Sequence, residues 1–94
     1  MRVDPDLVDI SRLDQDTRYR ILMYVLREKK VTSTKLGYSS NYINRVKRRV
    51  LRVSDGVLRV CLKLLSIEEY TRITGEEIEV VDVATVLRVL KYAL

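Results

Sequence analysis

The chain has 94 residues, of which 47% are hydrophobic and 33% are charged, and its formal net charge is +5. This length and apolar fraction predict one folded domain and argue against disorder. The chain has no histidine and a single cysteine, Cys61, so it lacks the commonest general base and cannot form an internal disulfide. We expect Cys61 to be a small residue of the core, and we expect the chain to have no enzymatic activity.

The sequence also argues against a membrane-spanning segment, a signal peptide and a phosphate-binding loop. No run approaches the ~18 consecutive apolar residues that span a membrane, and the N-terminus lacks the apolar core of a signal peptide. The three glycines, Gly37, Gly56 and Gly75, lie too far apart to form a phosphate-binding loop. We therefore expect a cytoplasmic protein, inside its host cell, with no catalytic residue, metal, cofactor or membrane partner.

The first third of the chain predicts an arm followed by a helix. Residues 1–13 contain the only proline and alternate acidic with apolar side chains, which indicates a loosely ordered N-terminal arm or a short turn, from which Val8, Ile10 and Leu13 can dock on the core. Asp14 or Asp16 then caps a helix over residues 17–29, in which apolar side chains recur at helical spacing. We expect residues 14–94 to form the folded domain.

The segment from residue 29 to residue 52 carries eight positive residues and no negative one, whereas the remainder of the chain is net negative. Charge that is concentrated in this way is typical of a surface that binds a polyanion. The positive residues are Lys29, Lys30, Lys35, Arg45, Lys47, Arg48, Arg49 and Arg52.

Inside this basic segment the sequence predicts a helix, a tight turn and a second helix. A short helix over residues 32–36 is followed by Gly37, which tolerates the positive φ of a tight turn. Ser39 is a favourable N-cap for the next helix, which is predicted to run to about residue 49. A basic second helix after a glycine turn is the layout of a helix-turn-helix, which enters the major groove of DNA.

The second of these helices is amphipathic. Ile43, Val46 and Val50 recur at helical spacing and predict an inward face. Outward-facing side chains at its start are predicted to read bases, since asparagine pairs with adenine and arginine with guanine. The predicted base-reading residues are Ser40, Asn41, Asn44 and Arg45. The predicted phosphate-binding residues are Lys29, Lys30, Lys35, Lys47, Arg48, Arg49 and Arg52.

Further helices are predicted downstream. Ser54 and Asp55 cap a fourth helix, and Ser66 with Glu69 forms a capping box for a fifth, which Gly75 ends. Residues 76–81 predict a short extended piece, and Asp82 caps a last helix. The predicted fold is all-α, a small domain of five to six helices that contains a repressor-like helix-turn-helix.

Three stretches of this sequence carry a family resemblance: KVTSTKLGYSSNYINRV at 30–46, VSDGVL at 53–58 and LLSIEEY at 64–70. Together they resemble the N-terminal region of archaeal tyrosine recombinases, the integrases of archaeal viruses and plasmids. The resemblance implies sequence-specific binding of double-stranded DNA in site-specific recombination and DNA integration. Those enzymes carry their tyrosine nucleophile in a C-terminal domain that this chain lacks, so none of its six tyrosines is expected to be catalytic.

Three functions remain open at this point. In the first hypothesis, the chain is the non-catalytic DNA-binding module of such an integrase, with a recombinase catalytic domain as its partner. Alternatively it is a free-standing transcriptional repressor, acting as a homodimer on a palindrome. In the third hypothesis it is an interaction domain, whose basic face meets an acidic protein or RNA.

Overall fold

A computed structural model describes residues 1–75 of the chain. Two 3₁₀ turns, η1 (Pro5–Leu7) and η2 (Ile10–Arg12), come first. The α-helices that follow are α1 (Gln15–Arg27), α2 (Ser33–Leu36), α3 (Ser40–Lys47), α4 (Asp55–Lys63) and α5 (Ile67–Thr74).

These elements confirm the all-α class. Within the described part of the chain the only extended pairing is an isolated bridge between Arg2 and Ser66. The extended piece predicted over residues 76–81 and the last predicted helix lie outside the described residues.

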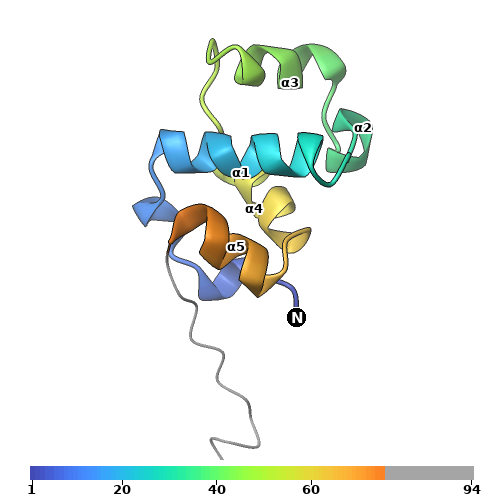
Figure 1. Ribbon diagram of the computed structural model, residues 1–94. Coiled ribbons are helices and arrows are strands. Elements are labelled where there is room, and N and C mark those ends of the chain that lie inside the picture. The colour runs from blue at the N-terminus through green and yellow to red at the C-terminus, as the bar shows by residue number, and fades with distance from the viewer. Residues whose placement is uncertain (76–94) are drawn as a thin grey trace, which may run out of the picture.

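Helix α1 is the central element of the fold. It packs against α4 and α5, which lie below it in Figure 1, while α3 lies above it on the opposite side. The short helix α2 contacts both α3 and α4. The α2–α3 pair therefore forms one end of the molecule, and the remaining helices with their shared core form the other.

The core consists of aliphatic side chains together with one tyrosine. Cys61 on α4 is fully buried, and this burial raises the pKa of its thiol to about 12, so the group is a neutral core residue as predicted. The other fully enclosed side chains are Ile21, Leu22, Val25, Val46, Val57, Leu58, Leu62, Leu65 and Tyr70.

Each α-helix begins at a side chain suited to capping. Asp14 accepts a hydrogen bond from the backbone N–H of Thr17 at 2.7 Å, so α1 begins two residues earlier than predicted. The capping box is confirmed: Ser66 and Glu69 each accept from the other's backbone N–H, at 3.1 and 2.9 Å. Gly75 ends α5 with a φ of +73°, a left-handed conformation that glycine adopts without steric cost.

The N-terminal segment forms short turns, and Leu13, Val8 and Ile10 pack on the core, which agrees with the second of the two predicted arrangements. Val3 and Leu13 are only 3% and 5% exposed. The backbone N–H of Val3 donates to the carbonyl of Leu65 at 2.9 Å, and that of Ile67 donates to the carbonyl of Met1 at 3.0 Å. Residues 1–13 are thus packed on the same core as the helices, because their alternating apolar side chains find partners there.

Candidate nucleic-acid interface

The α2–α3 pair is a compact unit held by its turn. Gly37 adopts a φ of +85°, and its N–H donates to the carbonyls of Ser33 and Thr34. Ser39 caps α3 by accepting from the N–H of Tyr42 at 3.2 Å. The hydroxyls of Ser33 and Ser40 lie 3.1 Å apart, in hydrogen-bond contact between the two helices. This side-chain contact and the turn together fix the direction of α3 relative to α2.

Helix α3 has one buried and one exposed face. Ile43 and Val46 are 3% and 1% exposed and join the core. At 3.6 residues per turn the opposite face carries Asn41, Asn44 and Arg45, all of which are exposed. The inward and outward assignment of these five residues from the sequence is confirmed.

Two tyrosines support α3 from the side. The rings of Tyr38 and Tyr42 are stacked, with their centroids 5.2 Å apart and an interplanar angle of 19°. The Tyr38 hydroxyl lies against α4 at Gly56, where a Cβ would come within 3.0 Å of it. The absence of a side chain at Gly56 therefore lets the tyrosine pair pack closely between α3 and α4.

The four predicted base-reading residues all lie on α3, but they differ in their availability. Within residues 1–75 the side chains of Asn41, Asn44 and Arg45 make no hydrogen bond or ion pair. The hydroxyl of Ser40 is already engaged with Ser33. Three free side chains, rather than four, are thus presented along the outer face of α3.

The seven predicted phosphate-binding residues divide in the same way. Lys29 donates to a carboxylate oxygen of Glu69 at 2.7 Å. Arg49 pairs with Asp16 at 2.8 Å, and its guanidinium lies 4.3 Å from the ring centroid of Tyr19. The other five are exposed and have no acidic partner in the described part of the chain: Lys30, Lys35, Lys47, Arg48 and Arg52.

Glu69 is the acceptor that removes Lys29 from the free basic surface. Its carboxylate accepts hydrogen bonds from Lys29, from the N–H of Ser66 and from the hydroxyl of Tyr24. These bonds lower the pKa of Glu69 to about 2, with the bond from Lys29 as the largest cause. The hydrogen bond that the Tyr24 hydroxyl donates to Glu69 raises the pKa of Tyr24. This cluster joins the end of α1 to the start of α5 and so has a structural role.

The sequence prediction for Val50 is wrong. Helical spacing predicts Val50 on the inward face of α3, but α3 ends at Lys47 and Val50 is 70% exposed. Arg49 adopts a φ of +61°, and the N–H of Val50 donates back to the carbonyl of Arg45 at 3.0 Å. The chain thus leaves the helix by a left-handed turn, so helical spacing no longer applies at Val50.

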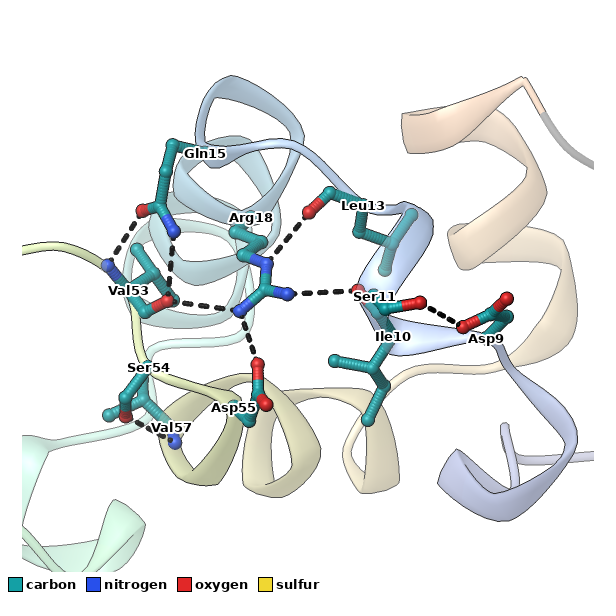
Figure 2. A network of polar contacts seen from close by, with 10 residues as sticks. All are labelled: Asp9, Ile10, Ser11, Leu13, Gln15, Arg18, Val53, Ser54, Asp55 and Val57. Atoms are coloured by element: carbon teal, nitrogen blue, oxygen red, sulfur yellow. Dashed lines mark hydrogen bonds and ion pairs between the residues drawn. The ribbon is translucent and has the colours of Figure 1, made fainter.

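The chain returning from α3 to α4 is clamped at Val53 by the start of α1. Gln15 donates to the carbonyl of Val53 at 3.2 Å and accepts from its N–H at 2.8 Å. Arg18 donates to the same carbonyl at 3.2 Å and to a carboxylate oxygen of Asp55 at 2.6 Å, as Figure 2 shows. This clamp fixes the point at which the chain returns from α3 to the core.

Sequence reasoning missed this clamp, although one signal of it was present. Arg18 lies three and four residues before Ile21 and Leu22, so it occupies the apolar stripe of α1. A charged residue at such a position needs partners inside the fold, and Arg18 is indeed only 8% exposed. For Gln15 no sequence signal pointed to the role, because its partner is a backbone group far along the chain.

Two kinds of site are not found among the described residues. Within residues 1–75 no group of three or more acidic or cysteine side chains is arranged to hold a metal ion. None of the helices in that range is long and apolar enough to cross a membrane. The candidate interface consists of amide and guanidinium groups on α3, flanked by cations that have no acidic partner in the described part of the chain.

Comparison with known proteins adds no family to this picture. No family model matches the chain, and neither the curated proteins nor the solved structures contain a significant match to it.

Proposed function

We propose that this chain binds double-stranded DNA, with the α2–α3 pair acting as a helix-turn-helix and α3 lying in the major groove. The observation that carries the proposal is the outer face of α3, where Asn41, Asn44 and Arg45 are exposed and make no side-chain hydrogen bond or ion pair with residues 1–75. Side-chain amides and guanidinium groups are the donors that read adenine and guanine in the major groove.

The dimensions of an α-helix suit this role. A helix with its side chains is about 10–12 Å in diameter, and the major groove of B-DNA is about 12 Å wide, so α3 can lie within the groove. With its N-terminal half against base edges, Asn41 and Asn44 contact adenine, and Arg45 contacts guanine through two hydrogen bonds. The surrounding free cations hold phosphates and set the register of the protein on the duplex.

The finer proposal is that this DNA binding serves an archaeal-type integrase. It rests on the sequence resemblance of residues 30–46, 53–58 and 64–70 to the N-terminal region of that family. In that role the chain is a non-catalytic module, which helps to place a recombinase catalytic domain on its attachment site.

The test is a fluorescence-anisotropy titration against a random duplex at several salt concentrations, followed by selection of preferred sites from a random pool. Five free cations predict a slope of log affinity against log salt of roughly −4 to −5, at about −0.9 per phosphate. Arg45→Ala should reduce discrimination between the selected site and a random duplex by about 1–3 kcal/mol.

The matched control is Arg12→Ala, because Arg12 is an exposed arginine on η2, outside the basic segment. It should leave both the salt slope and the site preference unchanged. Absence of duplex binding at low salt would refute the proposal and leave an acidic protein as the partner of the basic face. Symmetric footprints from a stable dimer would refute the integrase role and favour the repressor.

A further inference from the structure

The turn that follows α3, residues 48–52, carries an exposed apolar side chain between basic residues. Val50 is 70% exposed, and it stands between Arg48 and Arg52, which are both exposed and unpaired within residues 1–75. Figure 1 shows this turn beside the end of α3, at the edge of the molecule farthest from α5 and the N-terminus. An apolar group flanked by cations fits a partner whose surface is anionic but also carries exposed carbon atoms.

The turn is held firmly at both of its ends. On one side Arg49 is fixed by the carboxylate of Asp16 and the ring of Tyr19. On the other side Val53 is fixed by the clamp from Gln15 and Arg18. Holding the chain at both points limits the entropy that a partner's binding must overcome, so the outward direction of Val50 is set before any partner arrives.

The neighbouring Leu51 is also exposed, but less so than Val50. Leu51 is 37% exposed and lines an open hollow of about 370 Å³ between this turn and α1, which Tyr19 and Val46 also line. Val50 does not line this hollow, so it is the more solvent-exposed of the two apolar side chains on the turn.

We propose that this turn is a second DNA contact, in which Val50 packs against deoxyribose carbons while Arg48 and Arg52 hold the adjacent phosphates. The proposal rests on the proposed function. Because the turn directly follows Lys47, the last residue of α3, it lies next to the sugar-phosphate backbone that borders the groove when α3 lies in the groove. A second copy of this chain is a poorer occupant, since two such turns would bring their arginines together.

The experiment compares Val50→Ser with the wild-type chain in salt-dependent anisotropy titrations on a random duplex. Val50→Ser should weaken binding about three- to tenfold at every salt concentration, because it removes apolar contact, and should leave the salt slope unchanged. Val50→Thr keeps the β-branched shape and should give a smaller loss. Leu7→Ser is the matched control, since Leu7 is 66% exposed on η1, and it should bind like the wild type.

The outcomes separate this proposal from the one on which it rests. If the wild-type chain binds the duplex and Val50→Ser binds equally well, the turn makes no apolar contact and this proposal is wrong, while DNA binding stands. An equal loss in Leu7→Ser would also overturn it. So would self-association of the free wild-type chain that Val50→Ser abolishes without changing duplex affinity. A wild-type chain that binds no duplex refutes both proposals together.

Discussion

Arg18 on α1 and Arg45 on α3 show two opposite uses of the same side chain. Arg18 is 8% exposed, and its guanidinium donates to the carbonyls of Leu13, Ile10 and Val53 and to the carboxylate of Asp55. Arg45 is exposed and has no partner within residues 1–75. One arginine holds the fold together, and the other has all of its donors available to a ligand.

The same contrast runs through the two ends of the molecule. On the side of α1, α4 and α5, some cations meet acidic residues, as in the pairs Lys29–Glu69 and Arg59–Asp6, while others such as Arg20 and Lys63 form no ion pair within residues 1–75. On α3 there is no acidic residue at all. The difference teaches that the density of positive charge along the sequence does not by itself identify a binding surface. The position of the acidic residues in the fold decides which cations remain available.

Among the variants that test the contrast between buried and exposed arginines, we expect Arg18→Met to have the largest effect. The substitution removes the side-chain donor to the Leu13 carbonyl, one of the two donors to the Ile10 carbonyl and one of the three hydrogen bonds that clamp Val53. We expect the free energy of unfolding, measured by urea denaturation, to fall by about 2–4 kcal/mol. Arg20→Met is the matched control, because Arg20 is exposed on the same helix, and its change should stay within about 0.5 kcal/mol. If the free energy of unfolding fell equally in the two variants, the hydrogen bonds of Arg18 would not stabilise the fold more than the exposed Arg20 does.

A smaller effect is expected from Glu69→Gln. Glutamine can still complete the capping box through its amide oxygen, so the variant removes the charge that faces Lys29 and the oxygen that accepts from the Tyr24 hydroxyl. We expect the free energy of unfolding to fall by about 1–2 kcal/mol at pH 7.

The pH dependence of this variant follows from the lowered pKa. Glu69 has a pKa of about 2 in the folded chain against an ordinary value of 4.5, so its ionised form stabilises the fold above about pH 4.5. That contribution is lost as the pH falls from 4.5 toward 2. The difference in unfolding free energy between the wild type and Glu69→Gln should therefore shrink over this range. A difference that stays constant from pH 7 to pH 2 would show that the charge of Glu69 contributes nothing.

We expect the smallest effect when the two neighbouring arginines Arg48 and Arg49 are compared by their contributions to duplex binding. This pair tests the same contrast inside the basic segment. Arg48 is unpaired, whereas Arg49 is held by Asp16 and Tyr19. Arg48→Ala should reduce the salt slope of duplex binding by about 0.9 and weaken affinity about fivefold at 0.15 M salt. Arg49→Ala should change the slope by less than half as much, since its charge already faces a carboxylate. Equal slopes in the two anisotropy series would mean that Asp16 releases Arg49 to the DNA.

Much of the fold was readable from local patterns. The caps at Ser39, Ser54 and Ser66 and the stop at Gly75 were predicted because each depends on side chains within a few residues of it. The buried positions Ile43 and Val46 followed from helical periodicity. Val50 did not, since a left-handed conformation at a non-glycine residue, here Arg49, has no reliable signal in the sequence.

The candidate site was predictable only as a list of residues. The sequence identified the basic segment and the polar positions on α3, but it could not sort Lys29 and Arg49 from the unpaired cations, because Glu69 and Asp16 lie 40 and 33 residues away from them. Likewise it could not show that Ser33 engages Ser40.

The sequence alone therefore determined the helical class, the caps of α3, α4 and α5 and the amphipathic character of α3, which all arise from interactions between near neighbours in the chain. Only the tertiary structure decided which cations are neutralised, where the chain returns from α3 and how far Val50 is exposed beside it. Those outcomes depend on contacts between distant segments, such as the one between Gln15 and Val53, and the geometry of such contacts exists only once the core has assembled.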